Sequence, residues 1–220
     1  MSSVVGLGSE EETTDAERET QLTVLKTSLF FAGDGFSVYD CKGQVVFRVD
    51  SYGPDARDRD ELVLMDPNGR CLLTVRRKRP SLHQRWEGFQ GERREGDKPM
   101  FSVKRSSIIG RSSGVTVEVY DNPGEEYHIE GCFSNRSCTV FNASKEAVAQ
   151  IKRKVDPTTS VVLGKEVFSL CVKPPFDAAF AMAFVLVLDQ INGDDDHHLL
   201  STAPVDDPAV HPLPTPTQHH

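Results

Sequence analysis

Arginine and lysine side chains concentrated in one segment are the residues of this chain with the clearest chemical potential. Between Arg70 and Arg111 there are twelve basic residues and four acidic ones, a net charge of +8. Guanidinium groups pair with phosphate oxygens through two parallel hydrogen bonds, and each base near an anionic surface contributes about 1 kcal/mol. The segment therefore predicts binding to phosphoinositides or other anionic phospholipids. The predicted lipid-binding residues are Arg76, Arg77, Lys78, Arg79, Arg85, Lys104 and Arg105.

The contiguous basic run 76–79 also has other interpretations. Its four cations could lie at a solvated strand end, where ion pairs with neighbouring acids would help to hold the fold. Such a run also resembles a nuclear-import signal, although an ordered strand presents it poorly to an import receptor. No recognition helix or zinc motif accompanies the charge, so no specific nucleic acid is predicted. The expected partner is an anionic membrane lipid or a protein.

One short motif suggests an enzyme instead. Residues 110–114 read Gly-Arg-Ser-Ser-Gly and match the Gly-x-Ser-x-Gly pattern of a nucleophile elbow. An elbow requires a helix directly after it, whereas residues 115–120 alternate as in a strand, which favours a hairpin turn. A lipid-handling or hydrolytic enzyme is therefore the alternative function, and it would need a base positioned beside one of the two serines. His83 and His128 show no triad pattern, so we predict no catalytic residue.

Metal and redox chemistry have little support in the sequence. Residues 194–198 read Asp-Asp-Asp-His-His but lack the ligand spacing of a calcium loop, so we predict no metal and no cofactor. The cysteines are odd in number and form no Cys-x-x-Cys pair, which indicates reduced and largely structural thiols. A disulfide between Cys132 and Cys138 across a hairpin is the less favoured alternative. The five cysteines are Cys41, Cys71, Cys132, Cys138 and Cys171.

The distribution of charge suggests one domain between two acidic tails. The chain has 220 residues and a net charge of −8, yet residues 21–191 alone carry +2. We expect residues 1–20 and 194–220 to be disordered, because they hold too little apolar surface to offset the entropy of ordering. The domain then covers residues 21–193. Because the sequence shows no signal peptide and no lipidation motif, we expect a cytoplasmic protein, with a peripheral location at the plasma membrane or a nuclear location as alternatives. We also expect a monomer.

A continuous apolar segment near the end of the chain must be enclosed on every side. All eleven residues from Ala178 to Leu188 are apolar. A helix of this composition has no polar face, and at about 16 Å it is too short for the roughly 30 Å of bilayer hydrocarbon. We therefore predict a buried helix over 176–191, with Phe180, Phe184 and Leu188 among its most buried residues. Asp177 suits its first turn, and Asn192-Gly193 is the expected C-terminal stop.

The walls around this helix are predicted to be strands. Short runs rich in β-branched and aromatic residues alternate with glycine and proline turns. The expected strands are 22–25, 28–31, 36–40, 44–49, 61–65, 71–75, 85–90, 100–104, 115–120, 127–133, 138–141, 148–155, 160–163 and 166–172. About a dozen strands followed by one apolar helix predict a mainly β fold, a closed antiparallel barrel around a central C-terminal helix. A β-sandwich with the helix appended at one end is the second choice.

Three segments resemble one family. The segments are SLFFAGDGF at 28–36, LTVRRKRPSLHQRWEGFQGE at 73–92 and AFVLVLDQI at 183–191. They look like segments of the plant LURP-one-related proteins and occur in the same order. The resemblance covers about residues 22–192. That family is similar to the tubby C-terminal domain and the phospholipid scramblases. The resemblance implies a twelve-stranded barrel around a hydrophobic helix, which agrees with the residue patterns.

The functional content of the resemblance is narrower. It implies a role in plant stress or defence against pathogens without an established reaction. Tubby-like relatives are membrane-tethered transcription regulators that bind phosphoinositides through basic side chains. The scramblase relatives carry a calcium-type segment and a cysteine-rich palmitoylation stretch, and this sequence contains neither. We therefore predict a non-enzymatic module of tubby-like fold that binds anionic phospholipid or protein.

Overall fold

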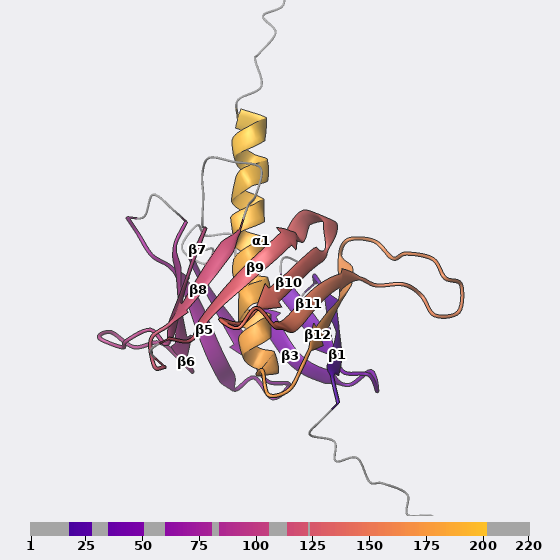
Figure 1. Cartoon of the computed structure of the whole chain (residues 1–220), viewed down its shortest axis with the longest axis horizontal. Helices are drawn as coiled ribbons and strands as arrows, with labels where there is room; N and C mark the ends of the chain where they lie inside the picture. Colours follow the sequence, from indigo (N-terminus) through magenta and orange to yellow (C-terminus); the bar gives the residue numbers. More distant parts are fainter. Residues whose placement is uncertain are drawn as a thin grey trace, which may run out of the picture.

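Figure 1 shows strands wrapped around one helix in a computed structural model of the chain. The structure describes residues 18–27, 35–50, 60–80, 84–105, 114–122 and 124–201, with side chains up to Gly193. Both predicted tails, residues 1–20 and 194–220, fall mostly outside these ranges. The predicted strand 28–31 falls outside them entirely.

The strands form one closed antiparallel barrel in which each strand pairs with its neighbours in sequence and β1 closes the ring against β12. The predicted fold is confirmed, and the sandwich alternative is wrong. The twelve strands are β1 (Thr20–Leu25), β2 (Gly35–Tyr39), β3 (Val45–Asp50), β4 (Glu61–Met65), β5 (Cys71–Arg77), β6 (Trp86–Gln90), β7 (Phe101–Arg105), β8 (Val115–Val119), β9 (Glu126–Cys132), β10 (Ser137–Phe141), β11 (Ala147–Arg153) and β12 (Val167–Val172).

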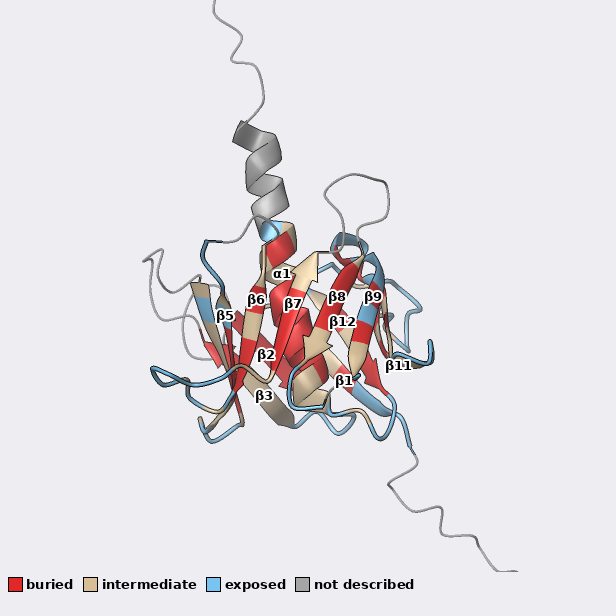
Figure 2. Ribbon diagram, turned by 60° about the vertical axis from the view of Figure 1, so that its left-hand side comes forward, coloured by how far each residue is buried: buried red, intermediate tan, exposed pale blue. Residues whose placement is uncertain are grey.

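Helix α1 (Ala178–Ser201) runs along the barrel axis, and its first half is buried inside the ring (Figure 2). The six residues from Met182 to Val187 have no exposed surface. Asp177 caps the start of the helix as predicted, since its carboxylate accepts a hydrogen bond from the Phe180 backbone N–H at 2.7 Å. An all-apolar helix inside a closed sheet removes its whole circumference from water, which is the arrangement that its composition requires.

The structure corrects the predicted ends of this helix. It begins at Ala178, two residues later than predicted, and it continues through Asn192 and Gly193 to Ser201. The side chain of Asn192 donates to the Leu188 carbonyl at 2.7 Å, within the helix, and so does not terminate it. A glycine costs a helix only about 1 kcal/mol relative to alanine, too little to stop a helix already held by the barrel. The predicted domain boundary at Gly193 therefore falls inside α1.

Aromatic rings fill the end of the barrel at which the helix enters. The ring centroid of Phe184 lies 5.7 Å from that of Phe101 on β7 and 6.0 Å from that of Tyr127 on β9. Phe184 and Leu188 are buried as predicted, at 0% and 4% exposure. Phe180 is only partly buried, contrary to the prediction, because it lies one turn nearer the open end and packs on Phe101 at 4.7 Å.

A glycine in the wall makes room for this packing. Gly88 on β6 pairs with Phe101 on β7, and a Cβ atom at Gly88 would lie 2.1 Å from the Phe101 ring. Any side chain there would displace the ring from the helix.

Two further results concern one predicted strand and membrane crossing. The predicted strand 160–163 is reduced to a single bridge between Val155 and Val162. Within the described part of the chain, no helix is long and apolar enough to cross a membrane.

We expect Phe184→Ala to lower the free energy of unfolding by about 3–5 kcal/mol, because it removes a fully enclosed ring and leaves a cavity. Phe184→Asp should abolish folding, since no partner is available for a buried carboxylate. Chemical denaturation measures both. Val161→Ala, at a site 58% exposed, is the control and should be close to neutral. A soluble and fully folded Phe184→Asp protein would show that α1 is not enclosed.

Deleting residues 194–220 should leave the melting temperature nearly unchanged, because Ile191 is the last core residue of α1 among the side chains that the structure describes. The same result is expected for deletion of residues 1–17, which precede β1. Calorimetry on the two shortened chains measures this directly. A drop of many degrees for either deletion would mean that the removed segment packs against the barrel.

Candidate anionic-ligand site

The basic run 76–79 lies at the edge of a hollow beside β5 and β6. Arg76 and Glu87 lie opposite each other across these strands, whereas Arg77 alternates with Arg76 and follows the face of Val75. Strand β5 extends two residues beyond its predicted end and includes Arg76 and Arg77. The connection between β6 and β7 supplies further lining residues. We call this hollow, with an empty volume of about 770 Å³, the basic hollow. Its lining residues are Asp60, Arg76, Arg77, Lys78, Arg79, Glu87, Phe89, Arg93, Arg94, Gly96, Asp97 and Pro99.

Three of the cations in the basic hollow form ion pairs. Lys78 lies 2.7 Å from a Glu87 carboxylate oxygen, and Arg79 lies 2.9 Å from an oxygen of Asp60. The third pair, Arg76 with Glu61, is long at 3.9 Å. The side chains of the three bases are 46%, 48% and 65% exposed for Arg76, Lys78 and Arg79. The ion-pair interpretation of the run thus holds in part.

The lining of the basic hollow keeps an excess of positive charge beside these pairs. Six bases and three acids line the basic hollow, so its lining has a net charge of +3. Exposed ion pairs are worth only about 0–1 kcal/mol each, so a phosphate could exchange with a carboxylate at small cost. A guanidinium has five N–H donors, and one carboxylate contact leaves several of them for another anion.

Two of the bases were missed by the prediction. Arg93 stacks over the Phe89 ring at 5.5 Å, which carries its guanidinium to the basic hollow. The backbone N–H of Arg94 donates to Asp97 at 2.6 Å in the turn that folds this connection back. Both residues belong to the basic segment, but only the fold of the β6–β7 connection shows that they face the run 76–79.

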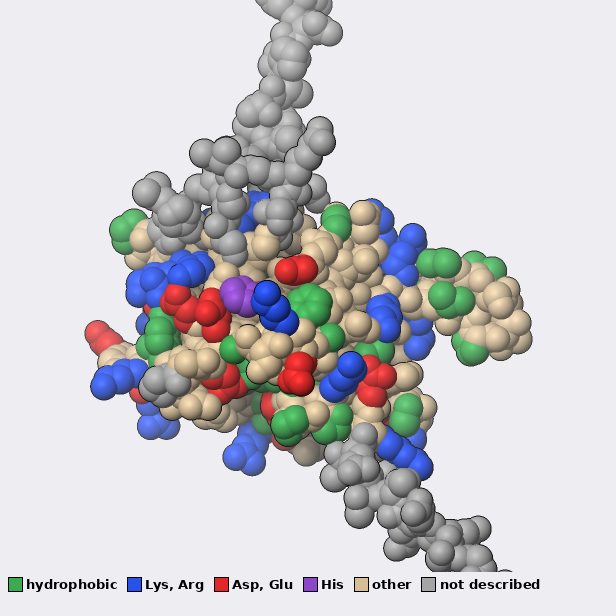
Figure 3. All heavy atoms as spheres, in the orientation of Figure 1, with side chains coloured by type: hydrophobic (Ala, Val, Ile, Leu, Met, Phe, Trp, Pro, Cys, Tyr) green, Lys and Arg blue, Asp and Glu red, His purple; other side chains and the backbone are tan. Residues whose placement is uncertain are grey.

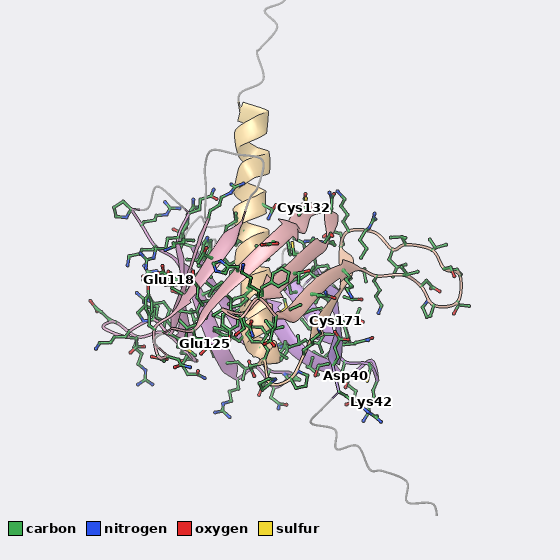
Figure 4. The ribbon with its side chains drawn as sticks, viewed as in Figure 1. Asp40, Lys42, Glu118, Glu125, Cys132 and Cys171 are labelled. Atoms are coloured by element: carbon green, nitrogen blue, oxygen red, sulfur yellow. The ribbon has the colours of Figure 1, made fainter. Side chains whose placement is uncertain are left out.

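Arg85 and Lys104 occupy a neighbouring area on the outer side of β6, β7 and β8. The Arg85 guanidinium donates to Ser102 at 3.1 Å and also to the Tyr120 hydroxyl. Lys104 pairs with Glu118, which is labelled in Figure 4. These contacts link three adjacent strands, so both cations contribute to the outer surface of the sheet and do not line the basic hollow.

Arg105 lies elsewhere. It lines a separate small pocket together with Leu188, Ile191 and Asn192 of α1. Because successive strand residues face opposite sides of a sheet, Arg105 and Lys104 are directed apart. Of the seven predicted residues, the structure therefore brings together the four of the run 76–79 and separates the other three from them.

The cysteines are free, as the reduced-thiol prediction requires. Cys132 is exposed near the helix exit (Figure 4), and a hydrogen bond with Ser134 lowers the pKa of its thiol. Burial raises the pKa of Cys138 to about 11. Within the described ranges, no group of three or more His, Cys, Asp or Glu side chains could hold a metal ion.

The nucleophile-elbow motif can be judged only from the segment that follows it. Ser112 and Ser113 lie outside the described residues. Strand β8 begins at Val115, directly after the motif, so the prediction of a strand there is confirmed. The helix that an elbow requires does not follow this motif.

Comparisons with known proteins agree on the family. The family model described as LURP-one-related matches residues 20–189. Protein LURP-one-related 12 of Arabidopsis thaliana is 62% identical over 197 residues, covering 90% of this chain and 86% of that protein. Protein LURP-one-related 5 of the same plant is 69% identical over 180 residues, covering 80% and 85%.

A solved structure supports the fold. The X-ray structure of another Arabidopsis thaliana protein superposes with a TM-score of 0.58 at 24% identity, over 80% of this chain and 93% of that one. With a family model across the whole barrel and two relatives above 60% identity, the chain belongs to the LURP-one-related family.

Proposed function

We propose that this chain is a non-enzymatic module that binds anionic phospholipid, with phosphoinositides as the preferred class, through the basic hollow. The observation that carries the proposal is the convergence of six bases from β5, the β5–β6 turn and the β6–β7 connection around one hollow. Arg85, directly before β6, and Lys104 on β7 lie outside the basic hollow and are paired with side chains of their own area. A protein ligand with phosphate or carboxylate groups is the alternative partner, because it would offer the same chemistry.

The acids near the basic hollow are placed so that a bound phosphate could displace them from their ion pairs. Glu61, Arg76 and Glu87 lie opposite one another across β4, β5 and β6. A phosphate that enters the hollow would take the place of carboxylate oxygens on cations that are already correctly placed. Placement before binding reduces the entropy that side chains lose on ligand binding. The hollow is therefore suited to a multiply charged headgroup.

The proposed biological setting is supported by family membership. We propose a role in plant stress or defence signalling, as a peripheral protein that reaches the plasma membrane from the cytoplasm, with transcriptional regulation in the nucleus as a second possibility. We propose that the chain acts as a monomer.

The proposal is tested with vesicles of phosphatidylcholine containing a phosphoinositide, vesicles containing phosphatidylserine, and neutral vesicles. Cosedimentation should show binding to the anionic vesicles that weakens steeply as salt rises, because exposed charges are screened beyond roughly 10 Å at 0.1 M salt. Stronger binding to the phosphoinositide than to phosphatidylserine at equal charge would support a headgroup site. Equal binding would indicate a general charge effect.

The matched variants are Arg77→Glu/Arg79→Glu and Lys42→Glu/Lys145→Glu, which change the net charge equally. Lys42 lies at the end of the barrel away from the helix exit (Figure 4). The first pair should weaken binding at least about thirtyfold, from about 1 kcal/mol per base and added repulsion. The second should bind like the unmodified protein. Binding that survives both high salt and the Arg77/Arg79 reversal would reject the basic hollow, provided that circular dichroism shows both variants folded.

A further inference from the structure

The connection between β11 and β12 exposes apolar side chains at a projecting tip. Val155, Val161 and Val162 are 48%, 58% and 48% exposed. Among the described residues, three of the four large exposed hydrophobic side chains belong to this one connection. We call these three valines the apolar tip. The connection extends away from the barrel wall in Figure 1, and its apolar surface is visible in Figure 3.

The tip is a well-formed hairpin. Val155 and Val162 face each other in an antiparallel bridge, flanked by backbone hydrogen bonds from Asp156 to Val161 and from Leu163 to Lys154, both at 2.9 Å. The Asp156 carboxylate accepts the backbone N–H groups of Thr158 and Thr159 at 2.7 and 2.9 Å and closes the turn. This hydrogen bonding gives the projection a fixed shape in the absence of any partner.

The valines occupy both faces of the hairpin. Directly opposed residues of an antiparallel pair point to the same face, so Val155 and Val162 share one face. Val161 is adjacent to Val162 and points to the other. A protein groove or a second sheet would cover one face and leave the other wet. Immersion in an apolar medium covers both faces at once, and this favours a lipid surface over a protein partner.

Basic residues surround the base of the hairpin. Residues 152–166 contain four bases and two acids, a net charge of +2. The bases are Lys152, Arg153, Lys154 and Lys165, and Figure 3 shows cationic side chains between the barrel wall and the tip. An apolar end above a cationic base matches the order of layers in an anionic bilayer, in which phosphates lie outside the acyl chains.

We propose that the apolar tip inserts into the interfacial layer of an anionic bilayer while the surrounding bases contact lipid phosphates. This rests on the proposed function, because it assigns a second point of attachment to the same membrane. Neighbouring strands are antiparallel, so β5 and β11 run in the same direction along the barrel axis. The β5–β6 and β11–β12 turns therefore lie at the same end of the barrel. Five strands lie between β5 and β11 in either direction around the closed ring, so the apolar tip and the cations that follow β5 are two separate points of contact at that end.

The insertion is shallow. Two backbone N–H groups hold the Asp156 carboxylate and lower its pKa, so this group stays charged and remains at headgroup depth. Three valines also supply little apolar area. The tip therefore adds to attachment through the bases and does not replace it.

The first test uses Val162→Trp in the full chain. Trp86, the single tryptophan of the chain, is 1% exposed, so the unmodified protein is the matched control. With phosphatidylserine-containing vesicles, the emission of the variant should shift to the blue and should be quenched by lipids brominated near the headgroup end of the acyl chain. The unmodified protein should show neither change. Quenching that is absent for a vesicle-bound variant would overturn the inference.

The second test compares Val161→Ser/Val162→Ser with Thr158→Ser in the same turn. Loss of the two apolar side chains should weaken binding to anionic vesicles roughly tenfold, whereas Thr158→Ser should not change it. Unchanged binding of the double variant would overturn the inference and leave the proposed function standing. No binding by the unmodified protein would reject the proposed function as well. Self-association in solution that the double variant abolishes would reassign the tip to a protein interface.

Discussion

The burial of α1 on all sides is the constraint on which the rest of the structure depends. A helix with no polar face needs apolar contacts around its whole circumference, and one open sheet could cover only part of it. Twelve strands close around it, and the pairing of β1 with β12 completes the ring. Closure also removes the exposed strand edges that would otherwise promote aggregation. The core and the topology therefore have the same cause.

Filling the barrel with a helix restricts where a ligand can bind. The interior is packed with side chains, with Phe184 in contact with rings from β7 and β9. The residues available for recognition then lie on the outer faces of the strands and in the connections at the barrel ends. The basic hollow is an outer-face site, and the apolar tip belongs to an end connection.

The fold could be predicted because its signals are local. The apolar run, the strand alternation and the turn residues each appear within a few residues of sequence. The run 76–79 converges because its members are adjacent in the chain. The position of Arg105 could not be predicted in the same way, since it depends on the strand face that it occupies and on the exit path of α1. The pairing of Arg79 with Asp60 depends on strand register, and the position of Arg93 depends on how the β6–β7 connection folds. Composition encodes neither.

A charged pair lies where α1 leaves the barrel. Asp189 lies one residue beyond the apolar run and pairs with Lys26 at 3.1 Å. Burial raises the pKa of Asp189, and Lys26 opposes that rise. A carboxyl whose pKa is raised by folding favours the folded state below its unfolded pKa, and this contribution is lost as pH rises through the folded pKa. The ionised carboxylate at neutral pH is therefore a cost that Lys26 partly offsets. The helix is held by its apolar turns, and the polar exit marks where enclosure ends.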